Sequence, residues 1–484
     1  MRRIFVSFLI LVMLVFGSVF GYKYWLLNQD WREEYAYAKG VDAFIHTFPY
    51  FLNSALRYKW SHSSGEINRG PSEAINQFWH APNVSHPRTY QDGGMPTRDA
   101  LYSVAWVWVG DEPTVIELPA FKKNRYYSVQ IAGFDSDNFA YITRRERGEG
   151  NGQFVITPPK WEGTLPNHLE FIAQAPTSWI FIILRVGLDP DDVQDLNEAK
   201  LLQMSANITS LSGEQLSNEY PNLAILGELG ENFLQQDMAD FLKQVIRQDP
   251  LLYWRVVNQA MTVNGLSPQD HKRLSDWADI GVGPGLNIDD FDESIRSGLS
   301  RSVLNSIMIM RDYVKESYGS KVVNGWSYPI SSTGRSGHAG HYLNRAALQS
   351  MTGVVAHDSE EAMYILVNRD SEGKPINGKH QYQVTFAAGQ LPDVSEFWSI
   401  TAYDNTGNLV VNDYERYSLN EAIVPLDYSE DGQLVLKFGG SEDEDSANWL
   451  PLPKKDMTLV LRAYGPGPDI VSQKWAPPPV VRLQ

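Results

Sequence analysis

Three groups of polar and aromatic residues in the sequence could carry chemistry. The first is the run Arg98–Ser103, which opens a predicted strand. An adjacent arginine and aspartate can hold each other in place or orient the carboxylate of a ligand. We therefore predict Asp99 and Tyr102 as catalytic acid–base residues, and Arg98 as a ligand-binding residue that stabilises an anion.

The second group places many hydrogen-bonding side chains on neighbouring predicted strands and turns, from Arg125 to Arg145. Within it we predict Asp135 as a further catalytic acid or base. Tyr127 and Arg145 are predicted ligand-binding residues, and Arg145 would stabilise an anion. Hydrolysis or elimination is the reaction class that such residues would serve.

The third group lies near the C-terminus, where aromatic residues alternate with arginine and asparagine. Here we predict Trp398, Arg416 and Trp449 as ligand-binding residues that line a pocket. A structural role is the alternative for all three groups. Large aromatic residues dominate core packing, and their polar tips need a partner when buried. The residues alone leave both interpretations open.

Standard catalytic and metal-binding signatures are absent from the sequence. It contains neither His-Glu-x-x-His nor Gly-x-Ser-x-Gly. His338 and His341 stand three residues apart but lack identifiable further ligands, so we predict no metal site. Gly281–Gly285 lacks the Gly-Lys-Ser/Thr ending of a phosphate-binding loop and is interpreted as a turn between helices. No motif in the sequence identifies a cofactor, so the cofactor is unknown.

Composition excludes several classes of function. The chain has 484 residues, with 58 acidic against 41 basic side chains and a net charge of −17. Such an acidic balance argues against nucleic acid as a partner. The chain has no cysteine. Disulfides, thiolate zinc sites, iron–sulfur clusters and cysteine nucleophiles are therefore excluded.

The N-terminus has the pattern of an export signal. Met1-Arg2-Arg3 precedes an apolar run from Ile4 to Phe20. A cleaved signal and a retained membrane anchor both fit this length. The aromatic stretch that follows favours the anchor, and the basic start predicts that the body crosses the membrane. We expect an inner-membrane protein with its body in the periplasm, or a periplasmic protein if the leader is cleaved.

Hydrophobic periodicity predicts two β-rich modules joined by a helical region. A helix is expected over residues 30–60. Short β-branched and aromatic runs follow to about residue 186 and predict strands such as Ser103–Val109 and Trp179–Val186. Similar runs return after residue 362 and predict strands such as Leu434–Phe438. We expect a mainly β fold with helices, built from two β-sandwich or jelly-roll modules. The predicted divisions are 1–21 for the leader, 30–188 for the N-terminal module, 189–330 for the helical region and 331–484 for the C-terminal module.

Short motifs spaced through the chain carry a family resemblance. The N-terminal motifs are Arg98–Trp106, Asp111–Pro113, Arg125–Tyr127 and Pro159–Gly163, and the C-terminal motifs are Gln390–Pro392, Phe397–Asp404, Arg416–Tyr417, Asn448–Pro451 and Leu461–Tyr464. They resemble the bacterial domains of unknown function 1254 and 1214, in that order. The resemblance implies an architecture of two β-sandwiches and export, which is found in many members. It is also compatible with self-association, and it implies no established reaction. Ala100 departs from it, because the family usually has Thr there.

Two functions from different classes fit these observations. One is a small-molecule enzyme or binding protein of the cell envelope, with a pocket in or between the sandwiches. The other is a non-catalytic, self-associating envelope protein that uses the sandwiches as interaction modules.

Overall fold

The computed structural model contains β-sheets and helices, as the sequence predicts. It describes residues 30–62, 71–72, 74–89, 94–122, 124–423, 425–440 and 446–483. The expected leader, residues 1–21, lies outside the described residues. Within the described part of the chain, no helix combines the length and the hydropathy that crossing a membrane requires.

The N-terminal module consists of two facing sheets that enclose one apolar core. One sheet has the strand order β1-β2-β8-β4-β5 and the other β7-β6-β3-β9. Alternate residues of β2 point to opposite faces, so Ala105 and Val107 enter this core while Trp106 enters the core of the helices. The bounds are β1 Trp79–His80, β2 Ala100–Trp108, β3 Thr114–Leu118, β4 Tyr127–Gly133, β5 Asn138–Thr143, α3 Arg144–Arg147, β6 Gly152–Thr157, β7 Glu170–Gln174, β8 Trp179–Gly187, α4 Val193–Ser205 and β9 Asn207–Ser210.

The C-terminal module also encloses its core between two sheets. Their strand orders are β10-β11-β12-β18-β14-β15 and β17-β16-β13-β19. The predicted strand Leu434–Phe438 is β16 itself. The bounds are β10 Val322–Val323, β11 Trp326–Ser327, β12 Ala362–Val367, β13 Tyr382–Phe386, β14 Val394–Asp404, β15 Ser418–Asn420, β16 Leu434–Phe438, β17 Trp449–Leu450, β18 Met457–Pro466, α14 Pro468–Val471 and β19 Val481–Arg482.

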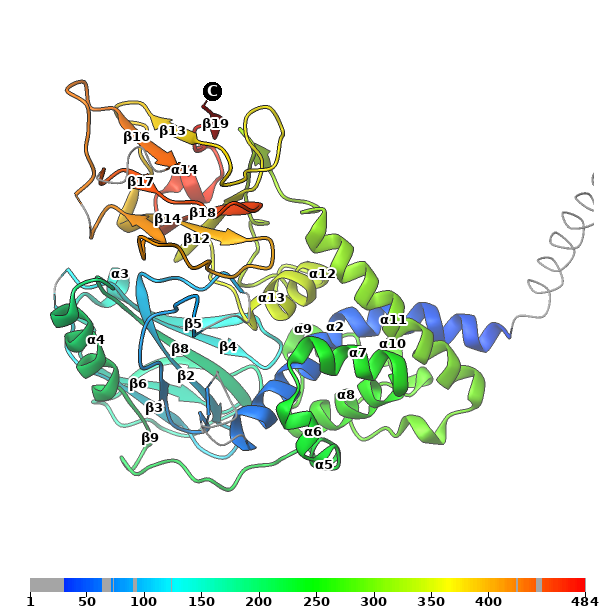
Figure 1. Cartoon of the computed structure of the whole chain (residues 1–484). Helices are drawn as coiled ribbons and strands as arrows, with labels where there is room; N and C mark the ends of the chain where they lie inside the picture. Colours follow the sequence, from blue (N-terminus) through cyan, green and yellow to red (C-terminus); the bar gives the residue numbers. More distant parts are fainter. Residues whose placement is uncertain are drawn as a thin grey trace, which may run out of the picture.

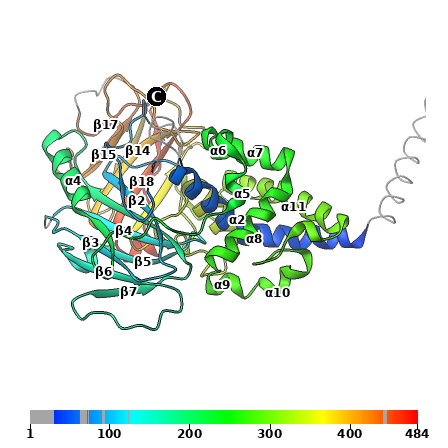
Figure 2. The ribbon, with the colours of Figure 1, turned by 90° about the horizontal axis from the view of Figure 1, so that it is seen from below.

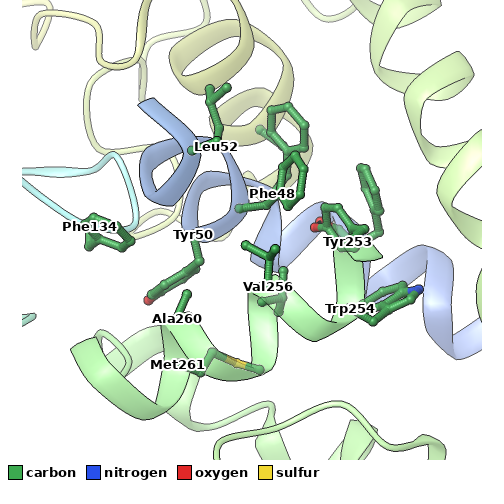
Figure 3. Packing of buried hydrophobic residues seen from close by; sticks show 14 of the residues in the cluster. Phe48, Tyr50, Leu52, Phe134, Tyr253, Trp254, Val256, Ala260 and Met261 are labelled. Carbon is green, nitrogen blue, oxygen red and sulfur yellow. Dashed lines mark hydrogen bonds between the residues drawn. The ribbon is translucent and has the colours of Figure 1, made fainter. Parts of the chain in front are cut away.

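Apart from α3, α4 and α14, which belong to the β modules, the helices lie together on one side of these modules (Figures 1 and 2). Their core includes the aromatic and aliphatic side chains of α2 and α8, and Phe134 reaches it from the N-terminal sheet (Figure 3). The bounds are α2 Trp31–His62, α5 Ala224–Gly227, α6 Gly230–Gln235, α7 Met238–Gln248, α8 Pro250–Asn264, α9 Pro268–His271, α10 Leu274–Trp277, η1 Ala278–Ile280, η2 Ile288–Asp290, α11 Glu293–Lys315, α12 Tyr342–Asn344, η3 Arg345–Ser350 and α13 Met351–Gly353.

Two glycines allow α2 and α11 to pack closely. A side chain at Gly298 would collide with the backbone oxygen of Glu33, and one at Gly40 would collide with Ser302. Small residues at a helix crossing let the two backbones approach. The long predicted helix at residues 30–60 is therefore positioned by α11 as well as by its own apolar face.

The three parts interleave more than the predicted divisions suggest. Helix α4 packs on the core of the N-terminal module and β9 joins its second sheet, although both were assigned to the helical region. Conversely, the segment from α12 to α13 packs on the core of the helices through Ala346 and Ala347, although it was assigned to the C-terminal module. Burial of these small apolar faces, and not chain order, decides where each segment lies.

A buried polar layer joins the two β modules. Antiparallel pairing places Tyr102 on β2 opposite Arg185 on β8, and Tyr364 on β12 opposite Arg462 on β18. The guanidinium of Arg185 lies over the ring of Tyr102, and that of Arg462 lies over the ring of Tyr364. Tyrosine rings thus cover buried cations, which offsets part of the loss of their hydration.

Candidate functional site

A polar cleft opens where the N-terminal module meets the start of the C-terminal module. Its volume is about 640 Å³, and β5, α3 and residues 331–335 and 358–361 form its walls. Figure 1 places α3 on the side of the N-terminal sheets that faces the C-terminal module. We call this the inter-module cleft. It is lined by Phe139, Ala140, Tyr141, Arg145, Glu146, Arg147, Ile172, Ser331, Ser332, Thr333, Arg335, Asp358, Glu360 and Glu361.

The turn between β4 and β5 holds one wall of the cleft in place. The carboxylate of Asp137 accepts the backbone N–H groups of Gly337 at 3.1 Å and His338 at 2.6 Å. The backbone N–H of Asn138 donates to the carbonyl oxygen of Gly334 at 2.8 Å. These bonds fix the Gly/Ser-rich loop of residues 331–340 against the N-terminal module.

Gly334 is required at the tightest point of this wall. Its φ is +98°, and a side chain there would collide with the carboxylate of Asp358. That carboxylate accepts hydrogen bonds from Arg335 Nε at 2.5 Å and from Asn138 Nδ2 at 2.8 Å. The two bonds tie residue 358 to the loop and to β5.

Glu361 contributes a carboxyl group to the cleft wall although its side chain is only 4% exposed. The hydroxyl of Tyr126 donates to Glu361 Oε1 at 2.8 Å. Burial raises the pKa of Glu361 to about 7, against the lowering effects of the Tyr126 hydrogen bond and of Arg145. At neutral pH a carboxyl with this pKa is present in both its protonated and its ionised form.

A tyrosine and a histidine meet behind Glu361. The hydroxyl of Tyr141 accepts the side-chain amide of Asn138 at 2.9 Å and the backbone N–H of Asp358 at 3.0 Å. The Tyr141 hydroxyl also lies 3.5 Å from Nδ1 of His357. Burial, followed by the charge of Arg185, lowers the pKa of His357 well below its ordinary value. The imidazole is therefore neutral.

A second group of acidic side chains surrounds a fully buried arginine. Arg345 donates two hydrogen bonds to Asp270, at 3.0 and 2.9 Å, and lies 3.4 Å from Asp135. Burial, followed by the charge of Asp137, raises the pKa of Asp135 to about 7. Burial opposes ionisation of Asp270 as well, but Arg345 and His46 outweigh it and lower that pKa to about 2. We call Arg345, Asp135 and Asp270 the Arg345 cluster.

Two of the predicted catalytic residues lie in the buried layer between the modules. The carboxylate of Asp99 accepts hydrogen bonds from Ser399 Oγ at 2.6 Å and Asn420 Nδ2 at 2.9 Å. Tyr102 lies under the guanidinium of Arg185. Asp99 therefore connects the two modules, and neither residue lines the inter-module cleft.

Arg98 and Tyr127 also lie away from the cleft. The guanidinium of Arg98 is 4.7 Å from the ring centre of Tyr417, and its side chain is buried. Tyr127 stacks on Phe121 within the N-terminal core, with ring centres 4.1 Å apart. Burial raises the pKa of Tyr127 to about 12. Both side chains are buried, and neither lines the inter-module cleft.

The three predicted residues of the C-terminal module do not line the inter-module cleft. They pack within that module. Trp398 belongs to its apolar core. Arg416 donates to the backbone oxygen atoms of Ser446 and Trp449, at 2.8 and 3.0 Å. The indole N–H of Trp449 donates to Gly439 at 2.9 Å. Of the nine predicted site residues, Arg145 lines the inter-module cleft and Asp135 belongs to the Arg345 cluster.

The sequence prediction did not select Glu361 or His357. Both come from the run His357–Glu361, a cluster of charged residues immediately before β12. That cluster was the available signal. An acidic run is usually a solvated turn, so only the burial of Glu361 distinguishes it.

Comparisons with known proteins identify two regions of the chain. A model of a protein of unknown function (DUF1254) matches residues 75–210, and a second (DUF1214) matches residues 361–468. The crystal structure of the VPA0106 protein from Vibrio parahaemolyticus is 20% identical, with a TM-score of 0.66, over 93% of this chain and 100% of that one. An uncharacterized protein from Burkholderia cenocepacia is 12% identical, with a TM-score of 0.44, over 90% of this chain and 88% of that one. No curated protein matches.

The match to the Vibrio structure is evidence for the fold. The Vibrio structure shares the fold over nearly the whole chain. In the part of the chain that the structure describes, no group of three or more histidine and acidic side chains is arranged to hold a metal ion.

Proposed function

We propose that this chain, which belongs to the proteins that pair an N-terminal DUF1254 region with a C-terminal DUF1214 region, binds a small molecule in the inter-module cleft. One observation carries the proposal: a buried carboxyl with a pKa of about 7, Glu361, shares the cleft with the partly exposed guanidinium of Arg145. Pockets with convergent polar groups and a titratable residue of shifted pKa are typical of binding and active sites.

The chemistry that the cleft supports is proton transfer. Glu361 can act as an acid or a base near neutral pH because its pKa lies there. Arg145 can stabilise negative charge beside it. Hydrolysis or elimination are reactions that such a pair would serve, with Glu361 in the acid–base role.

A blocking variant tests whether the cleft is a binding site. Ser331 lines the cleft, so Ser331→Trp should fill part of it. The exposed Ser275 on α10 provides a matched control, Ser275→Trp. A panel of carboxylates, phosphates, sugars and amines is screened by thermal shift on the whole chain. We expect at least one compound to raise the Tm of the wild type and of Ser275→Trp, but not of Ser331→Trp. Equal shifts in all three proteins would contradict the proposal.

Self-association is the second candidate function. Exposed apolar side chains gather on α11, and two of them, Met308 and Ile309, border a groove of about 520 Å³. Leu304, Met308 and Ile309 are 48%, 42% and 39% exposed. Exposed apolar patches mark interaction surfaces. Met308→Glu should then reduce the mass of the purified chain measured by light scattering, whereas Met204→Glu on α4 should not. A monomeric wild type would exclude this function.

We also propose export, with the body in the periplasm and the leader kept as an inner-membrane anchor or cleaved. The basic and then apolar start of the sequence supports it. Fractionation of the native host, with N-terminal sequencing of the mature chain, tests both alternatives. Recovery in the cytoplasm would contradict export.

For the C-terminal module we propose a jelly-roll connectivity. Sheets of six and four strands that enclose one core support it. An experimental structure that traces the strand connections would test it.

A further inference from the structure

We infer that the inter-module cleft takes an oxyanion, a carboxylate or a phosphate, on the guanidinium of Arg145, and that Glu361 takes up a proton when the anion binds. This inference rests on the proposed function, because it names the ligand class of the same cleft. It is argued from the pairing of the charged groups that line the cleft.

Among the arginines that line the cleft, Arg145 lies farthest from its partner carboxylates. Arg335 donates to Asp358, and Arg147 pairs with Glu170. The nearest carboxylate oxygen atoms to Arg145 Nη2 are those of Glu146 at 3.7 Å and Glu361 at 3.8 Å. Both distances exceed the range of a hydrogen bond.

The position of the Arg145 side chain is nevertheless defined. Its Nη1 donates to the backbone oxygen of Glu360 at 2.5 Å, and the side chain is 39% exposed. One edge of the guanidinium is therefore anchored at the wall of the cleft that Arg145 lines. A planar guanidinium held in this way matches the paired oxygen atoms of a carboxylate or a phosphate.

Glu361 opposes an anion at this position when it is ionised. Its Oε2 is 3.8 Å from Arg145 Nη2, so an anion on that nitrogen would lie close to a second negative charge. Like charges at such a distance disfavour each other strongly in a partly buried site. Protonation of Glu361 removes the conflict and leaves its Tyr126 partner in place.

Charged and titratable groups from several elements face Glu361. Glu396 on β14 disfavours its ionisation, but Arg144 pairs with Glu396 at 2.6 Å. Arg185 on β8 favours ionisation. The groups that interact with Glu361 include Tyr126, Tyr141, Arg145, Arg185 and Glu396.

The pH dependence follows from these groups. Glu361 has a pKa of about 7 in the folded chain. Below that pH the carboxyl is already neutral, so an anion binds without releasing or taking up a proton there. Above it, binding must draw a proton onto Glu361, and the affinity falls as the pH rises. For one fully linked proton the dissociation constant rises about tenfold per pH unit.

Calorimetric titration of the whole chain tests the inference. The probes are succinate, sulfate and the neutral analogue succinamide. Sulfate, the anion of a strong acid, stays fully ionised near neutral pH, and succinate is almost entirely a dianion above about pH 7, so proton uptake measured from about pH 7 to 8.5 belongs to the protein. Titration in buffers of different ionisation enthalpy counts the protons taken up. The variants are Arg145→Gln and Glu361→Gln, and the exposed Arg311→Gln and Glu430→Gln are their matched controls.

We expect the wild type and both controls to bind an anion with proton uptake above pH 7 and to ignore succinamide. Arg145→Gln should weaken anion binding about tenfold or more. Glu361→Gln should bind the anion with an affinity independent of pH and without proton uptake. Unchanged affinity in Arg145→Gln, unchanged proton uptake in Glu361→Gln, or no binding of either anion would overturn the inference.

The outcomes also separate this inference from the proposed function. If a neutral compound binds, Ser331→Trp abolishes its binding and neither anion binds to the wild type, the cleft remains a binding site and the oxyanion inference is wrong. If anions bind equally well to Ser331→Trp and to the wild type, both the cleft assignment and the inference are wrong.

Discussion

Two regions of the molecule hold a carboxyl group with a pKa of about 7, and they differ in access. Asp135 belongs to the Arg345 cluster, where neither its own side chain nor that of Arg345 is exposed. Glu361 lines the inter-module cleft beside the partly exposed Arg145. The comparison teaches that a shifted pKa records burial, and that only an accessible partner makes it a candidate for function.

The Arg345 cluster should be the more important region for stability. Arg345→Met would leave the buried carboxyl of Asp270 without the cation that lowers its pKa to about 2, so that it must either stay ionised without a partner or take up a proton. Removing one member of a buried ion pair costs about 3–5 kcal/mol. Urea unfolding at pH 7 measures the loss, with Arg311→Met on the exposed face of α11 as the control. A loss below about 1 kcal/mol would place the cluster among weak surface pairs.

Glu361 should control how stability changes with pH. Its pKa is near 4.5 when unfolded and about 7 when folded, so the folded chain holds the proton more tightly. Ionisation therefore lowers the free energy of unfolding as the pH rises from about 4.5 to 7, by up to about 3 kcal/mol. Glu361→Gln cannot ionise and should lack this decline. Unfolding titrations from pH 5 to 8 measure it, and a profile parallel to that of the wild type would show that Glu361 does not titrate in this range.

Asp135→Asn should sharpen the comparison, because it alters the same property in the closed region. The pKa of Asp135 is also raised, so its ionisation likewise lowers stability as the pH rises, and the Asn variant should flatten that decline. At pH 5 we expect a loss of about 1 kcal/mol, because an amide replaces one hydrogen-bond acceptor. Ligand binding in the cleft should not change. Weakened binding of a cleft ligand by Asp135→Asn would break the distinction between the two regions.

Arg145→Gln should have the smallest effect on stability and a large effect on binding. The side chain is 39% exposed and its ion pairs are long, so the free energy of unfolding should change by less than about 0.5 kcal/mol. Thermal unfolding with and without a cleft ligand measures both quantities. A large loss of stability in the unliganded chain would indicate that Arg145 is structural, like Arg345.

Much of the fold could be predicted from the sequence. The helix expected at residues 30–60 is α2, and the strands expected near residues 103–109, 179–186 and 434–438 are β2, β8 and β16. These segments carry strong local periodicity. Segments with weak local patterns, such as β7 and β9, were not predicted, because pairing with distant strands decides their conformation.

The candidate site was less predictable than the fold. Asp99, Tyr102 and Trp398 were selected because polar and aromatic residues gather around them, but the same pattern serves buried packing between and within the modules. Arg145 was selected for the same reason and does line the cleft. Residue type alone could not separate these cases.

The sequence by itself determined the acidic, cysteine-free composition, the order of the two β modules and their family, because composition and local patterns are properties of the chain. Only the tertiary structure decided which arginine is accessible and which carboxyl groups have a raised pKa. Arg145 meets Glu361 across more than two hundred residues, and Arg345 meets Asp135 across a similar separation. A pKa depends on burial and on charges nearby in space, and folding sets both.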